Sequence, residues 1–287
     1  MPSMSIKTRT VLISIIVTLA LTIVKTAVGL LTRSISVLSS ALDSFMDVCS
    51  MTINFAAVRA ADKPADEDHP FGHGKAEAVA GLFQATFIAA SATFLIVQAF
   101  HRMIDGYILE DEAVGIAMMI AAIIASIFLT RMMRRAGRRT QSCALEAGAL
   151  NFGADIWTNA GVLVALMLER WASVKNADPI ISILISLYIV VSAIRVGHDA
   201  IAQLMDLSLP SESLAIIDGC IRAHGPMVKG YHRLRTRRVG AERQIEFHLE
   251  IDRNTSFEHA HTVTEAIIAD IRHAIPGSHV TVHSDPV

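Results

Sequence analysis

The sequence predicts an α-helical membrane protein with six transmembrane helices, followed by a small α+β domain. Of its 287 residues, 52% are hydrophobic and only 18% are charged, whereas a soluble domain carries about 25% charged residues. The long apolar runs also lie almost entirely within residues 9–205, and the remainder has the composition of an ordinary soluble domain. We therefore expect a membrane domain over residues 1–208 and a cytosolic domain over residues 209–287.

Each transmembrane helix requires about 20 consecutive apolar residues to cross the hydrocarbon core of a bilayer. Six segments meet this requirement: residues 9–31, 36–60, 78–101, 112–133, 142–168 and 178–200. The first apolar stretch is longer than that of a signal peptide, and no small-residue cleavage site with a polar mature region follows it. We expect it to be a retained helix.

Basic residues predict the orientation, because they collect in the loops on the cytoplasmic side of a membrane protein. The segment RMMRRAGRR after the fourth apolar run carries five arginines and no acid, and Lys7 and Arg9 precede the first run. The connection around residues 105–112 is acidic instead. We expect both termini in the cytoplasm and a multi-pass protein of the bacterial inner membrane.

Charge and cysteine content argue against several classes of function. The net charge of −2 gives no sign of a nucleic-acid partner. Cys49, Cys143 and Cys220 are odd in number and lack paired spacing, so we expect reduced, mostly buried thiols. The loops and the tail supply no phosphate-binding turn and no nucleophile with an adjacent base. We expect neither an enzyme nor an organic cofactor.

Four oxygen-bearing side chains stand inside the predicted spans, where ionisable groups are costly and mark a pathway or cavity. Asp43 and Asp47 are four residues apart in the second span, and Asn151 and Asp155 repeat this spacing in the fifth. Residues four apart share a helix face. Since no Lys or Arg lies in the central part of any span, we expect a bound cation or protons to neutralise these acids.

The segment ADEDHPFGHGKAE, between the second and third spans, places Asp66, His69 and His73 three and four residues apart. These residue types at this spacing can supply three ligands to a divalent ion. The same pattern fits a solvated polar loop without a metal equally well. If the three residues instead held a catalytic metal, the protein would be a metalloenzyme, which the absence of a substrate cleft in the sequence disfavours.

The tail shows the pattern of a helix, two strands, a helix and a strand. We expect these elements at Ser211–Ala223, Val228–Val239, Gln244–Ile251, Phe257–Ala274 and His279–His283. The period of two in a strand puts His248 on the polar face of the second strand. With His232, His261, His283 and Asp285, it forms an imidazole-rich set that can hold one or two ions, although each His alone is more typical of a surface.

Several motifs together resemble the cation diffusion facilitator family, most closely its bacterial zinc and ferrous-iron efflux members. They are SALDSFMD in the second span, DEDHPFGHGKAE in the loop, NFGAD in the fifth span, LMDLSLP at the domain junction, and HLEI with VHSDP in the tail. The resemblance covers essentially the whole chain. It implies a homodimer, proton antiport and a ferredoxin-like tail.

The resemblance also assigns roles to individual residues. It implies a transport site on Asp43, Asp47, Asn151 and Asp155, a loop site on Asp66, His69 and His73, and a cytosolic site on His232, His248, His261, His283 and Asp285. A charge interlock at the neck of the dimer would fall on Lys75 and Asp206.

One departure from the family pattern affects the choice of ion. Members that move zinc typically carry His where this chain carries Asn151, so this transport site consists entirely of oxygen ligands. Oxygen ligands suit harder ions such as Mn²⁺ and Fe²⁺, whereas imidazole suits Zn²⁺. We expect the transported ion to be Fe²⁺, Mn²⁺, Co²⁺ or Zn²⁺, with a weaker preference for zinc than in a relative that carries His.

Because the amide of Asn151 does not titrate, only the carboxylates of the site can carry protons. Three like charges crowded in a poorly hydrated cavity favour proton uptake once the metal leaves. We expect alternating access with metal moving out as protons move in, regulated by metal binding to the tail. A metal-sensing membrane scaffold without transport is the alternative, but it would not require acids in two spans.

Overall fold

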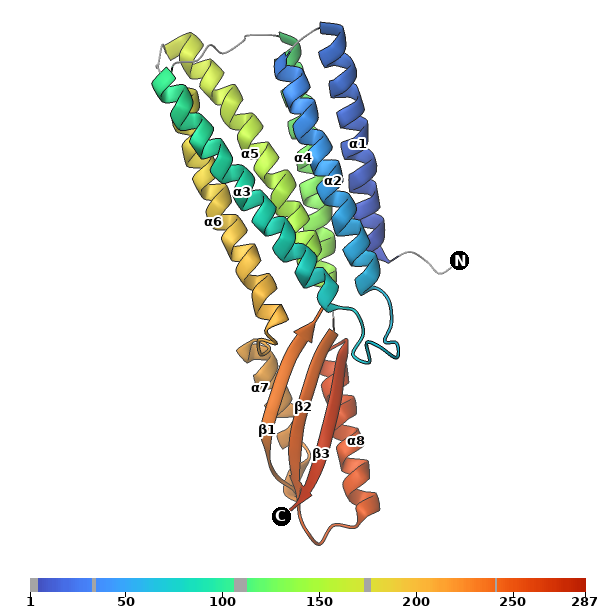
Figure 1. The fold of residues 1–287 in the computed structure, drawn as a ribbon. Coiled ribbons are helices and arrows are strands. Elements are labelled where there is room, and N and C mark those ends of the chain that lie inside the picture. Colours follow the sequence, from blue (N-terminus) through green and yellow to red (C-terminus); the bar gives the residue numbers. More distant parts are fainter. Residues whose placement is uncertain (1–4, 33–34, 106–112, 173–176, 241) are drawn as a thin grey trace. The chain divides into compact units, whose positions relative to one another are not determined.

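The computed structural model describes residues 5–32, 35–105, 113–172, 177–240 and 242–287. The chain divides into two compact units, Met1–Ile201 and Ala202–Val287. The first contains long helices, and the second contains two helices and a three-stranded sheet (Figure 1). The predicted fold class is confirmed, while the domain boundary between residues 208 and 209 stays a prediction.

The six long helices coincide with the six predicted spans to within a few residues at most ends. They are α1 (Ile6–Thr32), α2 (Ile35–Ala61), α3 (Lys75–Asp105), α4 (Ala113–Thr140), α5 (Cys143–Ala172) and α6 (Ala177–Leu204). By length and composition, α1, α3, α4 and α6 can each cross a membrane. Helices α2 and α5 are 27 and 30 residues long, and they carry the polar side chains of the predicted transport site.

The basic segment after the fourth apolar run is helical, which corrects its assignment to a loop. Helix α4 continues through it to Thr140. Arginine is a good helix former, so loss of hydrophobicity at Arg131 ends the apolar run without ending the helix. The arginines therefore have fixed places on a helix surface.

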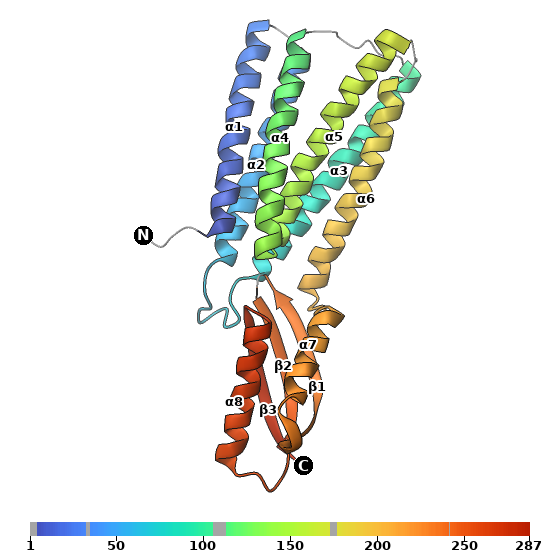
Figure 2. The same ribbon diagram turned by 180° about the vertical axis from the view of Figure 1, so that it is seen from behind.

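Helices of the first unit pack closely where glycines face a neighbouring helix. Helix α1 packs along α2 and α4, α4 packs along α5, and α3 contacts both α2 and α5 (Figure 2). A Cβ atom on Gly148 of α5 would lie 2.7 Å from Met133 Cε of α4, and one on Gly161 would lie 2.4 Å from Ile185 Cδ1 of α6. Small residues at such points are typical of packed membrane helices.

The second unit has the predicted αββαβ order. Its elements are α7 (Ser211–Arg222), a 3₁₀ turn (Gly225–Met227), β1 (Val228–Val239), β2 (Glu242–Ile251), α8 (Phe257–Ala274) and β3 (Ser278–Pro286). The sheet order is β1-β2-β3, with β1 antiparallel and β3 parallel to β2. Both helices cover one face (Figure 2), where Ile245, Phe247 and Leu249 are buried. The alternate residues of β2, including His248, therefore point to the other face.

All three cysteines are free thiols. Cys143 is buried and Cys220 is half-buried, but Cys49 is exposed. The expectation of burial is therefore wrong for Cys49, which lies on an exposed face of α2.

Candidate metal sites

Asp47 of α2 and Asn151 of α5 meet directly. The Asn151 amide donates a hydrogen bond of 2.7 Å from Nδ2 to Asp47 Oδ1, and Asn151 is only 7% exposed. Asp43 and Asp155 lie on the same two helices, one turn from these residues. Within the described residues, the three carboxylates do not all approach within 4.8 Å of one another. The structure thus joins the two predicted helices through one pair of the four side chains.

Lys25 of α1 corrects the expectation that only a bound cation or protons can neutralise these acids. It is 5% exposed, and its ammonium group donates hydrogen bonds to Ser44 Oγ at 2.8 Å and to the Ser40 carbonyl at 3.4 Å. Ser44 follows Asp43 directly on α2. The charge of Lys25 also interacts electrostatically with the carboxylates of Asp155, Asp47 and Asp43. A cation supplied by the chain therefore stands beside the predicted transport site.

The loop between α2 and α3 brings its three predicted ligands together. Asp66 Oδ1 accepts a 2.7 Å hydrogen bond from the His69 backbone N–H, and Asp66 Oδ2 lies 3.4 Å from His73 Nε2. The two imidazole centroids are 4.3 Å apart. One ligand atom from each residue lies within 4.8 Å of the other two. This is a group that one divalent ion can bridge.

The backbone of this loop explains why its side chains converge. Gly72 has a φ of 78°, which favours glycine, and its N–H donates to the His69 carbonyl at 2.9 Å. The hydrogen bond from the His69 backbone, followed by its side chain and the nearby imidazoles, lowers the pKa of Asp66. Asp66 is therefore ionised at neutral pH and able to serve as a ligand.

Strand register places three histidines in one row across the sheet of the second unit. His232 of β1 pairs with His248 of β2, which pairs with His283 of β3. The ring centroids are 5.0 Å apart for the first pair and 4.9 Å for the second. The register of β1 shifts between His232 and Arg235, and Arg233 has a positive φ of 51°. This bulge ends the regular pairing just after the histidine row.

Asp285 lies at the centre of this row. Its Oδ2 atom is 2.9 Å from His248 Nδ1 and 3.4 Å from His232 Nε2, and its Oδ1 atom is 3.1 Å from His283 Nε2. The hydrogen bond from His248, with the charges of the neighbouring imidazoles, lowers the pKa of Asp285. The ligand atoms of His232, His248 and Asp285 lie within 4.8 Å of one another. Four predicted ligands thus gather on the uncovered face of the sheet.

Two residues alter the predicted composition of this cluster. Glu250 was not predicted as a ligand, yet its Oε1 atom lies 3.0 Å from His232 Nδ1. A Cβ atom on the facing Gly230 would lie 2.8 Å from Glu250 Oε2, so the glycine leaves room for the carboxylate. His261 was predicted as a ligand, but over the described part of the chain no hydrogen bond, ion pair or ring contact joins it to the cluster.

The predicted charge interlock between Lys75 and Asp206 stays a prediction. Lys75 begins α3 in the first unit and Asp206 belongs to the second. Asp206 Oδ2 accepts a hydrogen bond from Arg237 Nη1 at 3.2 Å within its own unit.

Comparison with known families covers nearly the whole chain. The cation efflux transmembrane domain matches residues 11–205, and the cytoplasmic domain of cation efflux proteins matches residues 209–287. The chain belongs to the cation diffusion facilitator family. The predicted resemblance is confirmed, and the six-helix unit is the membrane domain of a cation efflux protein.

Curated members of this family are similar over most of their length. The cation-efflux pump FieF of Serratia proteamaculans is 39% identical over 256 residues, which are 89% of this chain and 84% of that protein. FieF of Salmonella arizonae is 39% identical over 269 residues, covering 93% and 89%. FieF of Cronobacter sakazakii is 38% identical over 279 residues, covering 97% and 92%. These cation diffusion facilitators are pumps, which agrees with a transporter rather than an enzyme.

Proposed function

We propose that this cation diffusion facilitator exports a divalent transition-metal ion through a site formed by Asp43, Asp47, Asn151 and Asp155. The contact between Asp47 and Asn151 carries the proposal, because it joins α2 to α5 through two of the four predicted ligands. The protein acts as a homodimer in the bacterial inner membrane, with both termini in the cytoplasm. Metal leaves the cell as protons enter, by alternating exposure of one site to the two sides.

The ion preference of the site follows from its ligands, which are all oxygen atoms. Asp and Asn supply oxygen ligands, which suit Mn²⁺ and Fe²⁺, whereas zinc gains from imidazole. We infer that Fe²⁺, Mn²⁺ and Co²⁺ compete with Zn²⁺ more effectively here than they would at a site that contains His.

Replacing Asn151 by His is expected to raise the affinity for Zn²⁺ relative to Mn²⁺ by at least about tenfold, because imidazole is the softer ligand. Competition binding of the two ions to the purified protein measures this ratio. Asn159→His is the matched control, since Asn159 lies two turns further along α5 and donates to the Asp155 carbonyl at 2.7 Å. An unchanged ratio in Asn151→His would remove Asn151 from the selectivity site.

Proton coupling follows from the charge balance at this site. Three carboxylates and Lys25 sum to −2 when every group is charged, and this total matches one divalent ion. When the ion leaves, the carboxylates lose their main counter-charge in a poorly hydrated place, so proton uptake restores the balance. Lys25 limits how many protons are needed, because its charged form offsets one negative charge.

The imidazole row of the second unit supports a regulatory role for metal binding. We propose that an ion bound by His232, His248, His283 and Asp285 favours one conformation of the homodimer and thereby sets the transport rate. Such coupling requires the ion to bind the two conformations with different affinity. His261 stands on α8, which covers the opposite face of the sheet, so this proposed site does not include it.

Replacing Asp285 by Ala is expected to weaken metal binding by the second unit at least about tenfold, because this carboxylate contacts three imidazoles. Isothermal titration of full-length protein that carries Asp47→Ala isolates the tail site from the transport site. His279→Ala is the control, since His279 lies on the same strand and pairs with Glu242 instead. Equal binding by both variants would contradict the assignment of Asp285.

Metal binding at the tail is also expected to depend on pH. Imidazole binds metal only after losing its proton, so protons compete with the metal for the ring nitrogens. The lowered pKa of Asp285 keeps that carboxylate ionised down to acidic pH. Affinity should therefore fall as the pH is lowered from neutral, while Asp285 is still ionised. Titration at several pH values checks this, and an affinity that stays constant from neutral to mildly acidic pH would contradict it.

The proposed function is tested by metal flux into sealed proteoliposomes. Zn²⁺, Fe²⁺, Mn²⁺ and Co²⁺ are compared with and without an imposed pH gradient. Flux that responds to the gradient supports antiport and ranks the ions. If no ion moves while the tail still binds metal, the protein is a metal-sensing scaffold and the transport proposal fails.

A further inference from the structure

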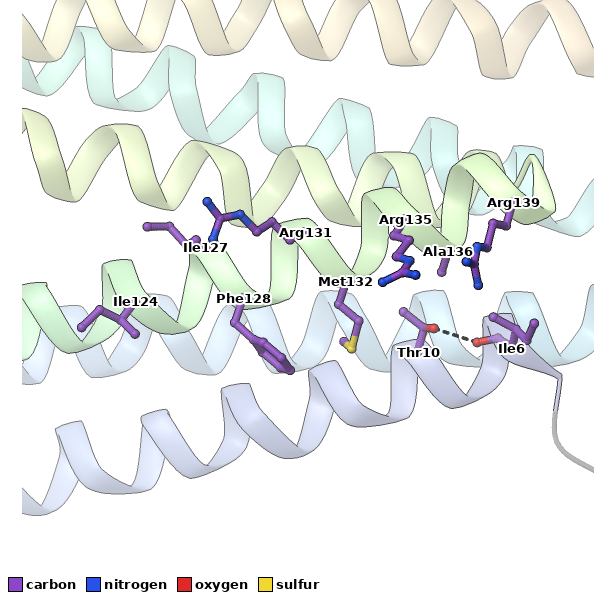
Figure 3. Close-up of a pocket in the computed structure, with 10 residues that line it drawn as sticks. All are labelled: Ile6, Thr10, Ile124, Ile127, Phe128, Arg131, Met132, Arg135, Ala136 and Arg139. Atoms are coloured by element: carbon purple, nitrogen blue, oxygen red, sulfur yellow. Dashed lines mark hydrogen bonds between the residues drawn. The ribbon is translucent and has the colours of Figure 1, made fainter.

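A cavity of about 650 Å³ lies between α1 and α4, apart from all residues of the candidate metal sites. Ile6 and Thr10 of α1 form one wall, and residues of α4 between Ile124 and Arg139 form the other (Figure 3). The Thr10 hydroxyl donates to the Ile6 carbonyl at 2.7 Å, so the α1 wall offers little polar binding capacity. The chemistry of the cavity therefore comes from α4.

Three arginines give one end of this cavity a positive charge. Arg131, Arg135 and Arg139 follow at intervals of four and share one face of α4. Arg135 and Arg139 extend toward Thr10 and Ile6 of α1, whereas Arg131 runs along α4 toward Ile127 (Figure 3). Over the described ranges, no ion pair joins any of the three arginines to a carboxylate. Among the residues that the structure describes, no acidic side chain lines the cavity, so none of its lining residues supplies a counter-charge to the cationic end.

The other end of the same cavity is apolar and open. Ile124 is 64% exposed and Phe128 is 54% exposed, and both belong to a helix that can cross a membrane, so lipid chains can contact them. The 16 residues from Ile124 to Arg139 span about 22 Å along a helix axis. Half of a bilayer, with its headgroups, has about the same thickness. The surface thus has an apolar strip followed by a cationic end, and its length matches that of one lipid molecule.

We propose that this cavity binds one anionic phospholipid. Its phosphate contacts the guanidinium groups of Arg135 and Arg139, and an acyl chain lies along Phe128 and Ile124. Guanidinium groups bind phosphate oxygens through paired hydrogen bonds, and basic clusters at the end of a transmembrane helix attract anionic headgroups. The apolar strip distinguishes a lipid from a free phosphate ion, which would not contact it. The proposal requires only that α4 lies in the membrane, not that the protein transports a particular ion.

The test measures lipid retained by the full-length protein. Wild-type protein is purified from micelles that contain equal amounts of phosphatidylglycerol and phosphatidylcholine, and bound lipid is counted by native mass spectrometry. Replacing Arg135 and Arg139 together by Gln is expected to lower phosphatidylglycerol retention about tenfold. The control replaces Arg134 and Arg138 by Gln, which removes the same charge from the same segment outside the cavity. This control should retain lipid as the wild type does.

Three outcomes would overturn the proposal. Equal loss in both double variants would indicate general attraction to a basic segment. Equal retention of the two lipids by the wild type would show that the headgroup charge is not recognised. Displacement of the lipid by millimolar inorganic phosphate would indicate a site for a free anion. Arg135→Lys with Arg139→Lys keeps both charges and is expected to retain most of the lipid, so failure of this variant alone would trace the loss to guanidinium geometry.

Discussion

Replacing Asp47 by Ala is expected to reduce metal flux at least about 100-fold in proteoliposomes. Asp47 accepts a hydrogen bond from Asn151 and is a predicted ligand of the transported ion. Each tenfold loss corresponds to about 1.4 kcal/mol, and removing one charged ligand from a divalent ion at a partly buried site costs several times this amount. The flux assay compares wild-type and variant protein at one metal concentration with the same pH gradient.

Two further variants separate loss of charge from loss of structure. Asp47→Asn keeps an oxygen that can accept the hydrogen bond from Asn151, so it should fold normally and still transport poorly. Asp199→Ala removes an acid from α6 that is 70% exposed at its side chain and should leave flux unchanged. If Asp47→Asn transported as well as the wild type, the carboxylate charge would not be part of the transport site.

The residues of the loop site could be predicted from sequence because their geometry is local. Asp66, His69 and His73 lie within eight consecutive residues, and a turn shaped by Gly72 is enough to bring their ligand atoms together. The helices were equally predictable, because apolar length defines a transmembrane segment. Their ends were not, since α4 continues through arginines that are polar but favour helix.

The tail site shows where sequence information stops. Alternation predicts that His248 faces away from the core, but it does not predict which residue of a neighbouring strand lies beside it. The row of His232, His248 and His283 depends on the register of two strand pairs and on a bulge after His232. Glu250 was missed for the same reason, because its contact with His232 crosses between strands.

Lys25 was missed because its partners lie on other helices. A single lysine in an apolar run has no periodic pattern, and its role depends on how α1 packs against α2. The structure directs its ammonium group to Ser44, the neighbour of Asp43. Only the tertiary contact distinguishes this lysine from one that extends toward a membrane surface.

Replacing Lys25 by Met is expected to tighten metal binding at the transport site by about 10- to 100-fold and to slow metal release. When charged, Lys25 competes with the metal for the same three carboxylates, with which it interacts electrostatically. At an effective dielectric of about 20, a positive charge near the site but outside direct contact weakens the binding of a divalent ion by a few kcal/mol. Methionine has a similar length and tolerates a buried position, so the change in charge dominates. Equilibrium binding and single-turnover release of Mn²⁺ measure the two effects.

Lys25→Arg and Ser44→Ala distinguish charge from position. Arginine keeps the positive charge, so its metal affinity should stay within a few-fold of the wild type. Ser44→Ala removes the hydrogen bond to Lys25 Nζ but keeps the lysine, and its effect should be smaller than that of Lys25→Met. If Lys25→Met bound metal as the wild type does, the lysine would not act on the transport site, although the site itself could still be correct. Both Lys25 variants disrupt the contact of α1 with α2, but only Lys25→Met removes the charge. A loss of binding in both would therefore show that the lysine holds α1 against α2.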